Sequence, residues 1–202
     1  MKTLTKTLFA AALTAVLLSS SVLKSVAAEP IITESASSSQ NFNMIWVSGN
    51  VKIVLTQGDK QGVVGTFNYD SKNTSVLSKG QTLYINSTES SQVTLNITVK
   101  DLRRVEAYGQ SVVVTSNSFN VENLQLFLNQ SSIAKINTKA TSLYTIVKDD
   151  AKLKLNGSAG ESTMVASNMK NIRMNDFASL KSSSYATEAI MTAEQNAIAF
   201  AK

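Results

Sequence analysis

The residues that could perform acid–base, nucleophilic or metal chemistry are few in this 202-residue chain. It contains no His and no Cys, so it lacks the commonest general acid/base, the commonest metal ligand and the thiolate nucleophile. Zinc sites, Cys nucleophiles and Ser-His-Asp triads are thereby excluded. The only adjacent acidic pair is Asp149 and Asp150, whereas a glycosidase or polysaccharide lyase needs clustered carboxylates or a base beside a cation site. We therefore predict no catalytic, cofactor-binding or metal-binding residue, and we expect that the protein is not an enzyme.

Three basic residues recur at steps of nineteen, each between apolar neighbours: Lys135, Lys154 and Arg173. Stacked side by side they form either a solvated outer face or a ligand-binding stripe. Alternation requires something polar at these positions, which favours the solvated face. Acidic residues lie close enough in sequence to compensate the charge, and they are Asp149, Asp150, Glu161 and Asp176.

Aromatic residues are the candidates for stacking on a glycan, although most of them fit a core or a ladder equally well. They are Trp46, Phe67, Tyr69, Tyr108, Phe127, Tyr144 and Tyr185. No basic stripe is interleaved with aromatics, so we expect no nucleic-acid partner. The expected partner is an envelope protein or a glycan.

The elements that carry these residues are predicted to be β-strands in a repeat. The apolar pattern around Lys135 returns around Lys154 and Arg173, and each copy follows a second short apolar segment, as at residues 126–128 and 145–147. A period of about 20 residues with two short strands is typical of a solenoid. We predict an all-β protein with a parallel β-solenoid over residues 101–202. Its rungs should be nineteen to twenty-one positions long, and it should end in a final strand.

Residues 42–100 show short alternating apolar segments separated by turns. Residues 48–50 interrupt the first alternation, and residues 57–59 and 79–81 contain Gly at the next turns. Strands are expected at residues 63–69, 83–85 and 93–99. This half should form a strand-rich region ahead of the repeats, and the length after the predicted leader suits one or two compact units.

The amino terminus resembles a secretory leader. Residues 8–18 are apolar, basic residues precede them, and small residues close the segment near Ala28. The apolar run is shorter than the roughly 20 residues of a membrane span. We predict a signal peptide at residues 1–28, a flexible lead-in at 29–41, and a mature chain without a transmembrane span. Loss of Lys2, Lys6 and Lys24 would leave 16 basic and 14 acidic residues, a net charge of +2.

Residues 45–59 (IWVSGNVKIVLTQGD) resemble the opening of the head GIN domain family, also called putative auto-transporter adhesins. The resemblance spans residues 31–192. It implies an exported protein with a right-handed parallel β-helix or β-solenoid fold, in which residues 42–202 form one unit, and with no established catalytic role. Family members repeat an S-G-A-S turn, and here residues 108–111 alone keep its Gly. Gln130, Met169 and Thr187 fit a positive-φ turn poorly, so a change of turn type is expected there.

These observations predict an exported, non-enzymatic protein of the cell envelope or surface that serves adhesion or recognition through one face of a β-solenoid. It would reside in the periplasm, on the outer-membrane surface or outside the cell. The alternative is a periplasmic carbohydrate-binding or carbohydrate-active protein.

Overall fold

The computed structural model describes residues 41–186, and the predicted signal peptide, nearly all of the lead-in and the predicted final strand lie outside them. The described residues are all-β, as predicted, with twelve strands and one 3-10 helix. The strands are β1 (Met44–Gly49), β2 (Val51–Gln57), β3 (Gly62–Gly65), β4 (Thr74–Lys79), β5 (Thr82–Ser87), β6 (Val93–Val99), β7 (Arg104–Ala107), β8 (Val112–Thr115), β9 (Phe119–Leu128), β10 (Ile133–Val147), β11 (Lys152–Ala166) and β12 (Ile172–Ala186), with the helix η1 at Met169–Asn171.

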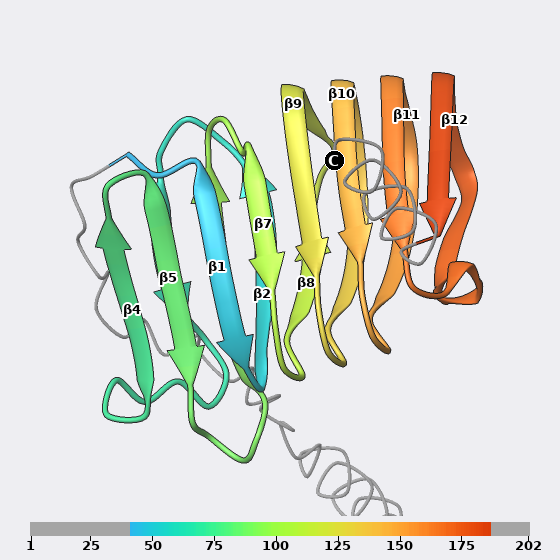
Figure 1. Ribbon diagram of the computed structural model, residues 1–202. Helices are drawn as coiled ribbons and strands as arrows, with labels where there is room; N and C mark the ends of the chain where they lie inside the picture. Colours follow the sequence, from blue (N-terminus) through green and yellow to red (C-terminus); the bar gives the residue numbers. More distant parts are fainter. Residues whose placement is uncertain (1–40, 187–202) are drawn as a thin grey trace, which may run out of the picture.

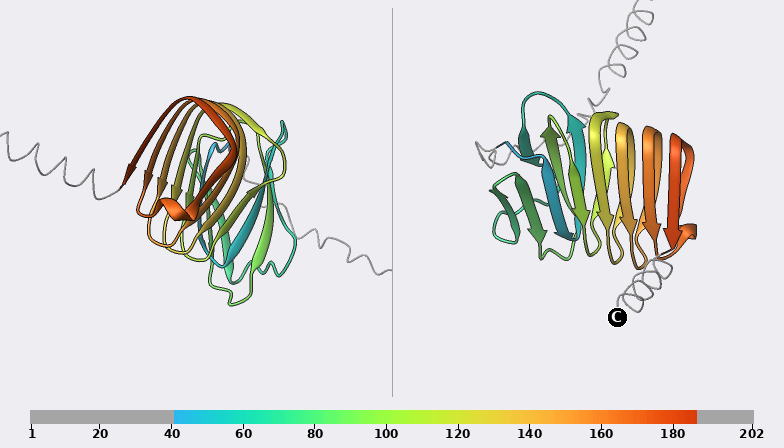
Figure 2. Two further views of the ribbon diagram at one scale, coloured as in Figure 1. Left: turned by 90° about the vertical axis from the view of Figure 1, so that its right-hand side faces the viewer. Right: turned by 45° about the horizontal axis from the view of Figure 1, so that its top comes forward.

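One continuous sheet folds over to form two faces (Figure 1). The front face consists of β4, β5, β1, β7 and β9 with the carboxyl-terminal halves of β10 to β12. The back face consists of β3, β6, β2 and β8 with the amino-terminal halves of β10 to β12. The end-on view in Figure 2 shows these long strands curving from one face to the other.

The predicted spacing matches the parallel pairing of the later strands. Ile133 pairs with Lys152, and Leu153 pairs with Ile172, an offset of nineteen positions in each case. Ile133 also pairs with Val112, twenty-one positions earlier. The prediction of two short strands per period is wrong beyond residue 133, because each of β10, β11 and β12 is one strand of 15 residues. The parallel pairing of β10 with β11 continues across the bend between the two faces, from the pair Ile133 and Lys152 to the pair Val147 and Ala166.

The amino-terminal half is strand-rich, as predicted, but its strands do not stack in chain order. Strand β1 lies between β5 and β7, and β2 lies between β6 and β8, all in parallel pairs. Strands β3 and β4 pair antiparallel with β6 and β5. The predicted strand at residues 63–69 is shorter, at Gly62–Gly65, and β4 was not predicted.

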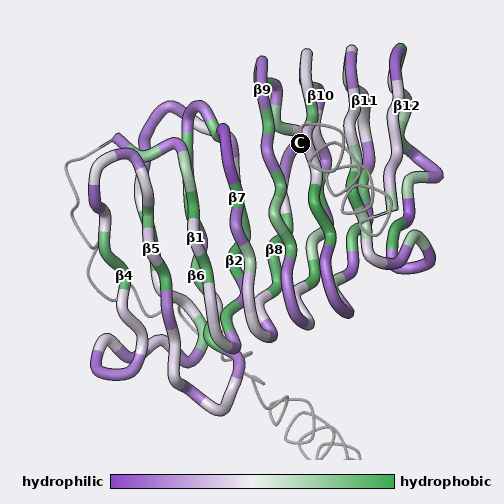
Figure 3. Tube along the Cα trace, in the orientation of Figure 1, coloured by the Kyte–Doolittle hydropathy of each residue, from purple (hydrophilic) through white to green (hydrophobic). Residues whose placement is uncertain are grey.

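The core lies between the two faces and follows the alternation of the strands. On β2, for example, Val51, Ile53 and Leu55 are fully buried, while Lys52 and Val54 between them point outward and are partly exposed. Figure 3 shows the same alternation of hydrophobic and hydrophilic residues along the strands. The burial of the two neighbouring residues on such a strand therefore fixes the side chain between them on the outer side of the sheet.

A column of left-handed residues turns the chain from the front face to the back face. Gly49, Gly109, Gln130 and Asp149 have φ values of 92°, 67°, 59° and 56°. The prediction that Gln130 abandons a positive φ is therefore wrong. The Oε1 atom of Gln130 accepts a hydrogen bond from the Gly109 N–H at 2.6 Å, and the Gln130 N–H donates to Asp149 Oδ2 at 2.9 Å. These bonds between successive turns compensate for the unfavourable backbone conformation.

The next turn does change type, as predicted for Met169. Met169 begins η1, and the preceding Asn168 has an extended φ of −143° and accepts a hydrogen bond from the Lys170 N–H. Thr187 lies outside the described residues.

Candidate functional site

The acidic pair occupies an exposed turn rather than a catalytic cleft. Asp149 and Asp150 are both exposed, and the Asp149 carboxylate is used by the Gln130 N–H. Among residues 41–186, no group of three or more acidic side chains is arranged to hold a metal ion. The pair therefore has the local hydrogen-bonding role that is common for Asp in turns.

The aromatic candidates, in contrast, gather on the front face. Register relationships link one residue on each of eight strands into a row across this face. We call this row the aromatic row, and in spatial order it contains Leu77, Tyr84, Trp46, Glu106, Phe127, Ile146, Val165 and Tyr185. Trp46, Phe127 and Tyr185 thus lie in one row, on β1, β9 and β12, although they are far apart in the sequence.

Some rings of the row contact each other or rings beside the row. The Trp46 ring centroid lies 6.1 Å from that of Tyr84 and 5.5 Å from that of Tyr108, both tilted. Phe127 lies 6.1 Å from Tyr144, which precedes Ile146 by two residues. These distances fall within the range of favourable aromatic pairs. The sheet therefore presents Tyr84, Trp46 and Tyr108 as one apolar platform with polar ring edges.

Two charged residues of β7, Glu106 in the row and Arg104 beside it, lie between Trp46 and Phe127. The Arg104 guanidinium carbon lies 5.3 Å from the Phe127 ring centroid, and Arg104 Nε donates to Gln125 Oε1 at 2.8 Å. The Tyr108 hydroxyl donates to Glu106 Oε2 at 3.5 Å. Burial first, and then the negative charge of Glu106, raise the pKa of Tyr108 above its ordinary value of 10.0. Tyr108 therefore keeps its proton and donates a hydrogen bond at neutral pH.

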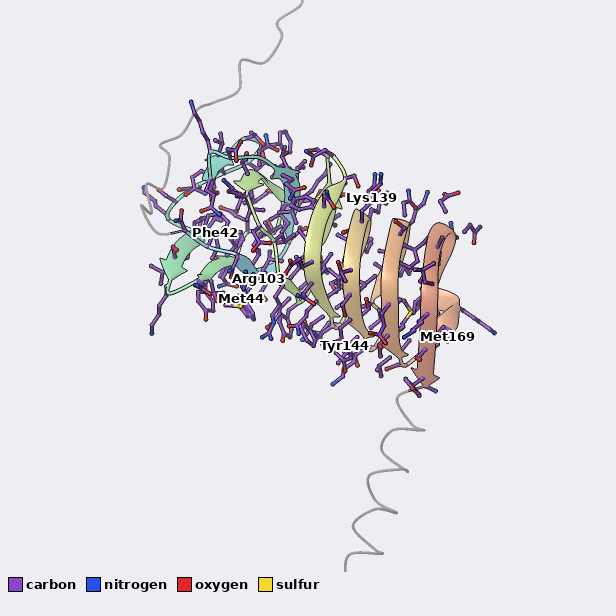
Figure 4. The ribbon with its side chains drawn as sticks, turned by 90° about the horizontal axis from the view of Figure 1, so that it is seen from above. Phe42, Met44, Arg103, Lys139, Tyr144 and Met169 are labelled. Atoms are coloured by element: carbon purple, nitrogen blue, oxygen red, sulfur yellow. The ribbon has the colours of Figure 1, made fainter. Side chains whose placement is uncertain are left out.

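A polar cleft adjoins the row at one end of β1, β7 and β9, with a volume of about 630 Å³. Its lining residues are Asn43, Met44, Gln81, Asp101, Arg103, Arg104, Asn120, Val121, Glu122, Asn123 and Gln125. Figure 4 looks down on this end and labels Met44 and Arg103 close together. Arg104 lines the cleft and also contacts the row, so a ligand can reach amide, guanidinium and aromatic groups together.

Two of the predicted aromatic residues lie elsewhere, and one member of the platform was missed. Phe67 is 64% exposed in the segment after β3, and Tyr69 packs against the core. Tyr84, which is 41% exposed, completes the platform beside Trp46. Alternation between Leu83 and Ile85 was a sufficient signal that Tyr84 points outward, but its neighbour Trp46 is far away in the sequence.

The basic residues form the predicted column on the back face. Lys135 pairs with Lys154, and Lys154 pairs with Arg173, and all three are exposed. The three ion pairs among residues 41–186 involve other basic residues. The nearby acids in the sequence therefore do not form ion pairs with the column, although Asp176 is in register with Asn156 beside it.

Comparison with known proteins places this geometry in a family. Residues 41–191 match the family described as putative auto-transporter adhesin, head GIN domain. The chain belongs to this head GIN domain family. The match confirms the resemblance predicted from the sequence, including the segment at residues 45–59, over nearly all of its predicted span. No curated protein matches the chain.

Several solved structures share the fold of this head GIN domain. A putative adhesin from Bacteroides fragilis is 17% identical, with a TM-score of 0.63 over 73% of this chain and 72% of the other. A putative lipid binding protein from Parabacteroides distasonis is 13% identical, with a TM-score of 0.56 over 73% and 75%. A putative adhesin from the same species is 15% identical, with a TM-score of 0.53 over 72% and 74%. At these identities the likeness concerns the fold.

The head GIN domain shows no helix long and apolar enough to span a bilayer within residues 41–186.

Proposed function

We propose that this head GIN domain protein is an exported, non-enzymatic recognition or adhesion module that binds its partner through the front face. The observation that carries the proposal is the aromatic row with the polar cleft beside it. A mostly apolar platform bordered by a few fixed polar groups is the usual composition of a binding site. The partner is an envelope protein or a glycan, and the protein acts in the periplasm, on the outer-membrane surface or outside the cell.

The architecture supports this role because it repeats side chains at regular intervals. Parallel pairing at offsets of nineteen to twenty-one positions supports a description of these coils as a right-handed parallel β-solenoid. Such stacks offer long surfaces whose outward residues recur at every rung. The leader-like residues 1–28 support export, with cleavage near Ala28. The absence of His and Cys, together with the local role of Asp149, supports a protein without catalytic function.

Binding of a carbohydrate is the second candidate, and the platform of Tyr84, Trp46 and Tyr108 favours it. Flat ring faces stack on the apolar faces of sugars, while the amides and Arg104 at the cleft satisfy hydroxyl groups. Neutral polar partners such as Asn43 and Gln125 are suited to hydroxyl-rich ligands because they both donate and accept.

A glycan array with the purified protein, followed by calorimetry on any ligand found, tests the proposal. Trp46→Ala combined with Tyr84→Ala should weaken binding at least tenfold, because it removes two adjacent rings. Phe67→Ala is the matched control, since it removes an exposed ring outside the row and should change binding less than twofold. Urea unfolding of each variant checks that the fold persists.

The outcome of these experiments distinguishes a glycan ligand from a protein partner. Glycan binding that depends on Trp46 and Tyr84 supports the carbohydrate candidate. Binding to a purified envelope protein, with the same dependence and no glycan signal, supports recognition of a protein partner. Equal effects of Phe67→Ala and of the double substitution would refute the front face as the binding surface.

A further inference from the structure

The back face carries a depression lined by positive charge. It has a volume of about 320 Å³ and lies across β10, β11, η1 and the start of β12. Its basic lining residues are Lys135, Lys152, Lys154, Lys170 and Arg173, and its other lining residues are Ile133, Ala134, Leu153 and Asn171. The lining therefore contains five cations and no acid, although the whole chain has 19 basic and 14 acidic residues.

The sheet holds these cations close together. Lys135, Lys154 and Arg173 occupy successive strands in register, which are about 4.8 Å apart. Lys152 precedes Lys154 by two residues and points to the same side, and Lys170 approaches from η1. Like charges at this spacing repel one another, so the burial of Ala134, Leu153 and Leu155 is what keeps them aligned.

We propose that this depression binds an acidic polysaccharide, a linear glycan that carries carboxylate, sulfate or phosphate groups along its length. This site is separate from the front face and does not rest on the function proposed for it. The ligand would lie along the stacking direction of β10, β11 and β12, with successive negative groups meeting Lys135, Lys154 and Arg173. The rung spacing is comparable to the length of one sugar residue, so a negative group on each sugar can follow the column.

A polymer fits this surface better than a single small anion does. Exposed cations contribute little each in water, and the N–H groups of β10 and β11 are engaged in the parallel ladders rather than gathered around an anion as in a nest. Several weak contacts on one chain, however, add up through effective concentration. The aromatic row lies on the opposite face, so the stacking that single-stranded nucleic acids use is absent from the depression.

Binding of dextran sulfate and of polygalacturonate to the purified protein, with neutral dextran as the uncharged reference, tests the proposal. Affinity for the acidic polymers should fall at least tenfold between about 50 and 200 mM salt, because bound counterions are released. The variant Lys135→Gln/Lys154→Gln/Arg173→Gln should bind at least thirtyfold more weakly at low salt. For this variant, the slope of log affinity against log salt concentration should be shallower by about two to three, roughly one for each cation removed.

The matched control is Lys60→Gln/Lys79→Gln/Lys139→Gln, which makes the same change in net charge at three exposed lysines outside the depression. Lys139 lies on β10 itself, on the other side of the coil from Tyr144 (Figure 4). This control should lose less than threefold. All six substitutions are at exposed positions, so the two variants should unfold at the same urea concentration as the parent.

The outcomes separate the possible ligands. Equal losses in the two triple variants would overturn the proposal, because net charge and not the depression would then govern binding. Preferential binding to single-stranded DNA or to phosphatidylglycerol vesicles over both acidic polysaccharides would also overturn it. Binding of inorganic phosphate alone, with no gain from a polymer, would refute the linear ligand.

Discussion

The turn at Gln130 allows the cost of a left-handed residue to be separated from the hydrogen bond that compensates for it. Gln130 has φ 59° and is exposed, and its Oε1 accepts from the Gly109 N–H at 2.6 Å. Gln130→Ala removes this acceptor and keeps a Cβ at positive φ. Gln130→Gly removes the acceptor and the Cβ together.

The expected free energies of unfolding follow from these two contributions. A hydrogen bond of this kind contributes about 1 kcal/mol net, and an L-residue in the left-handed region costs about 1 kcal/mol relative to Gly. Gln130→Ala should therefore be about 1 kcal/mol less stable than the parent, because it loses the bond and keeps the strain. Gln130→Gly should be within about 0.5 kcal/mol of the parent, because it loses the bond but relieves the backbone.

Urea unfolding measures both variants, and the comparison is valid where the m-value stays constant. A difference of about 1 kcal/mol corresponds to roughly 2 to 4 °C in Tm for a domain of this size. Gln110→Ala, at an exposed position of the preceding turn, is the control and should change stability by less than about 0.5 kcal/mol. Equal stabilities of Gln130→Ala and Gln130→Gly would refute the reasoning, since the left-handed backbone would then cost nothing.

Two further predictions concern a close backbone approach and a titration. Gly157 has φ 105°, and a Cβ there would collide with the Thr138 carbonyl oxygen, so Gly157→Ala should lower the free energy of unfolding, measured in urea, by at least about 3 kcal/mol. The control is Gly62→Ala, because a Cβ at Gly62 meets nothing within 4 Å. Equal effects of the two substitutions would contradict the packing argument. Glu106→Gln should lower the pKa of Tyr108 from its raised value, because it removes the negative charge beside the hydroxyl group while burial remains. Tyrosinate absorbance measures this pKa, and an unchanged value would show that Glu106 has no electrostatic effect on Tyr108. Because the folded-state pKa is raised, the stability that protonated Tyr108 contributes is present below its unfolded pKa and is lost as pH rises through the folded pKa.

The later strands were predictable because each strand pairs with the next turn of the chain. Lys135, Lys154 and Arg173 recur at steps of nineteen, and the strands pair with the same offset at these residues. The sequence pattern therefore directly predicts which of these residues are neighbours in space. The sequence could not show that each period is a single strand. Whether one strand continues through the bend depends on pairing with a neighbouring strand on each side, as at Thr138, which pairs with Phe119 and with Gly157.

At the turns, too, the sequence indicates part of the structure and contacts with neighbouring strands decide the rest. The need for Gly49 was visible as an interruption of alternation, but its cause is the Ser87 carbonyl on β5, which would collide with a Cβ at that position. The intrinsic preference of Gln130 against a positive φ predicts a different turn. That prediction is wrong because neighbouring turns supply hydrogen bonds that the isolated residue lacks.

The sequence by itself determined the all-β class, the family, the repeat spacing and the side of the sheet to which most strand residues point, because alternation and period are local properties of the chain. Only the tertiary structure decided which outward residues share a surface. Strand β1 pairs with β5 and with β7, so that Met44 lies beside both Thr82 and Arg104, and no periodic signal marks such distant partners. The aromatic row joins Tyr84, Trp46 and Phe127 through those pairings, and the basic depression needs η1 to bring Lys170 beside the column.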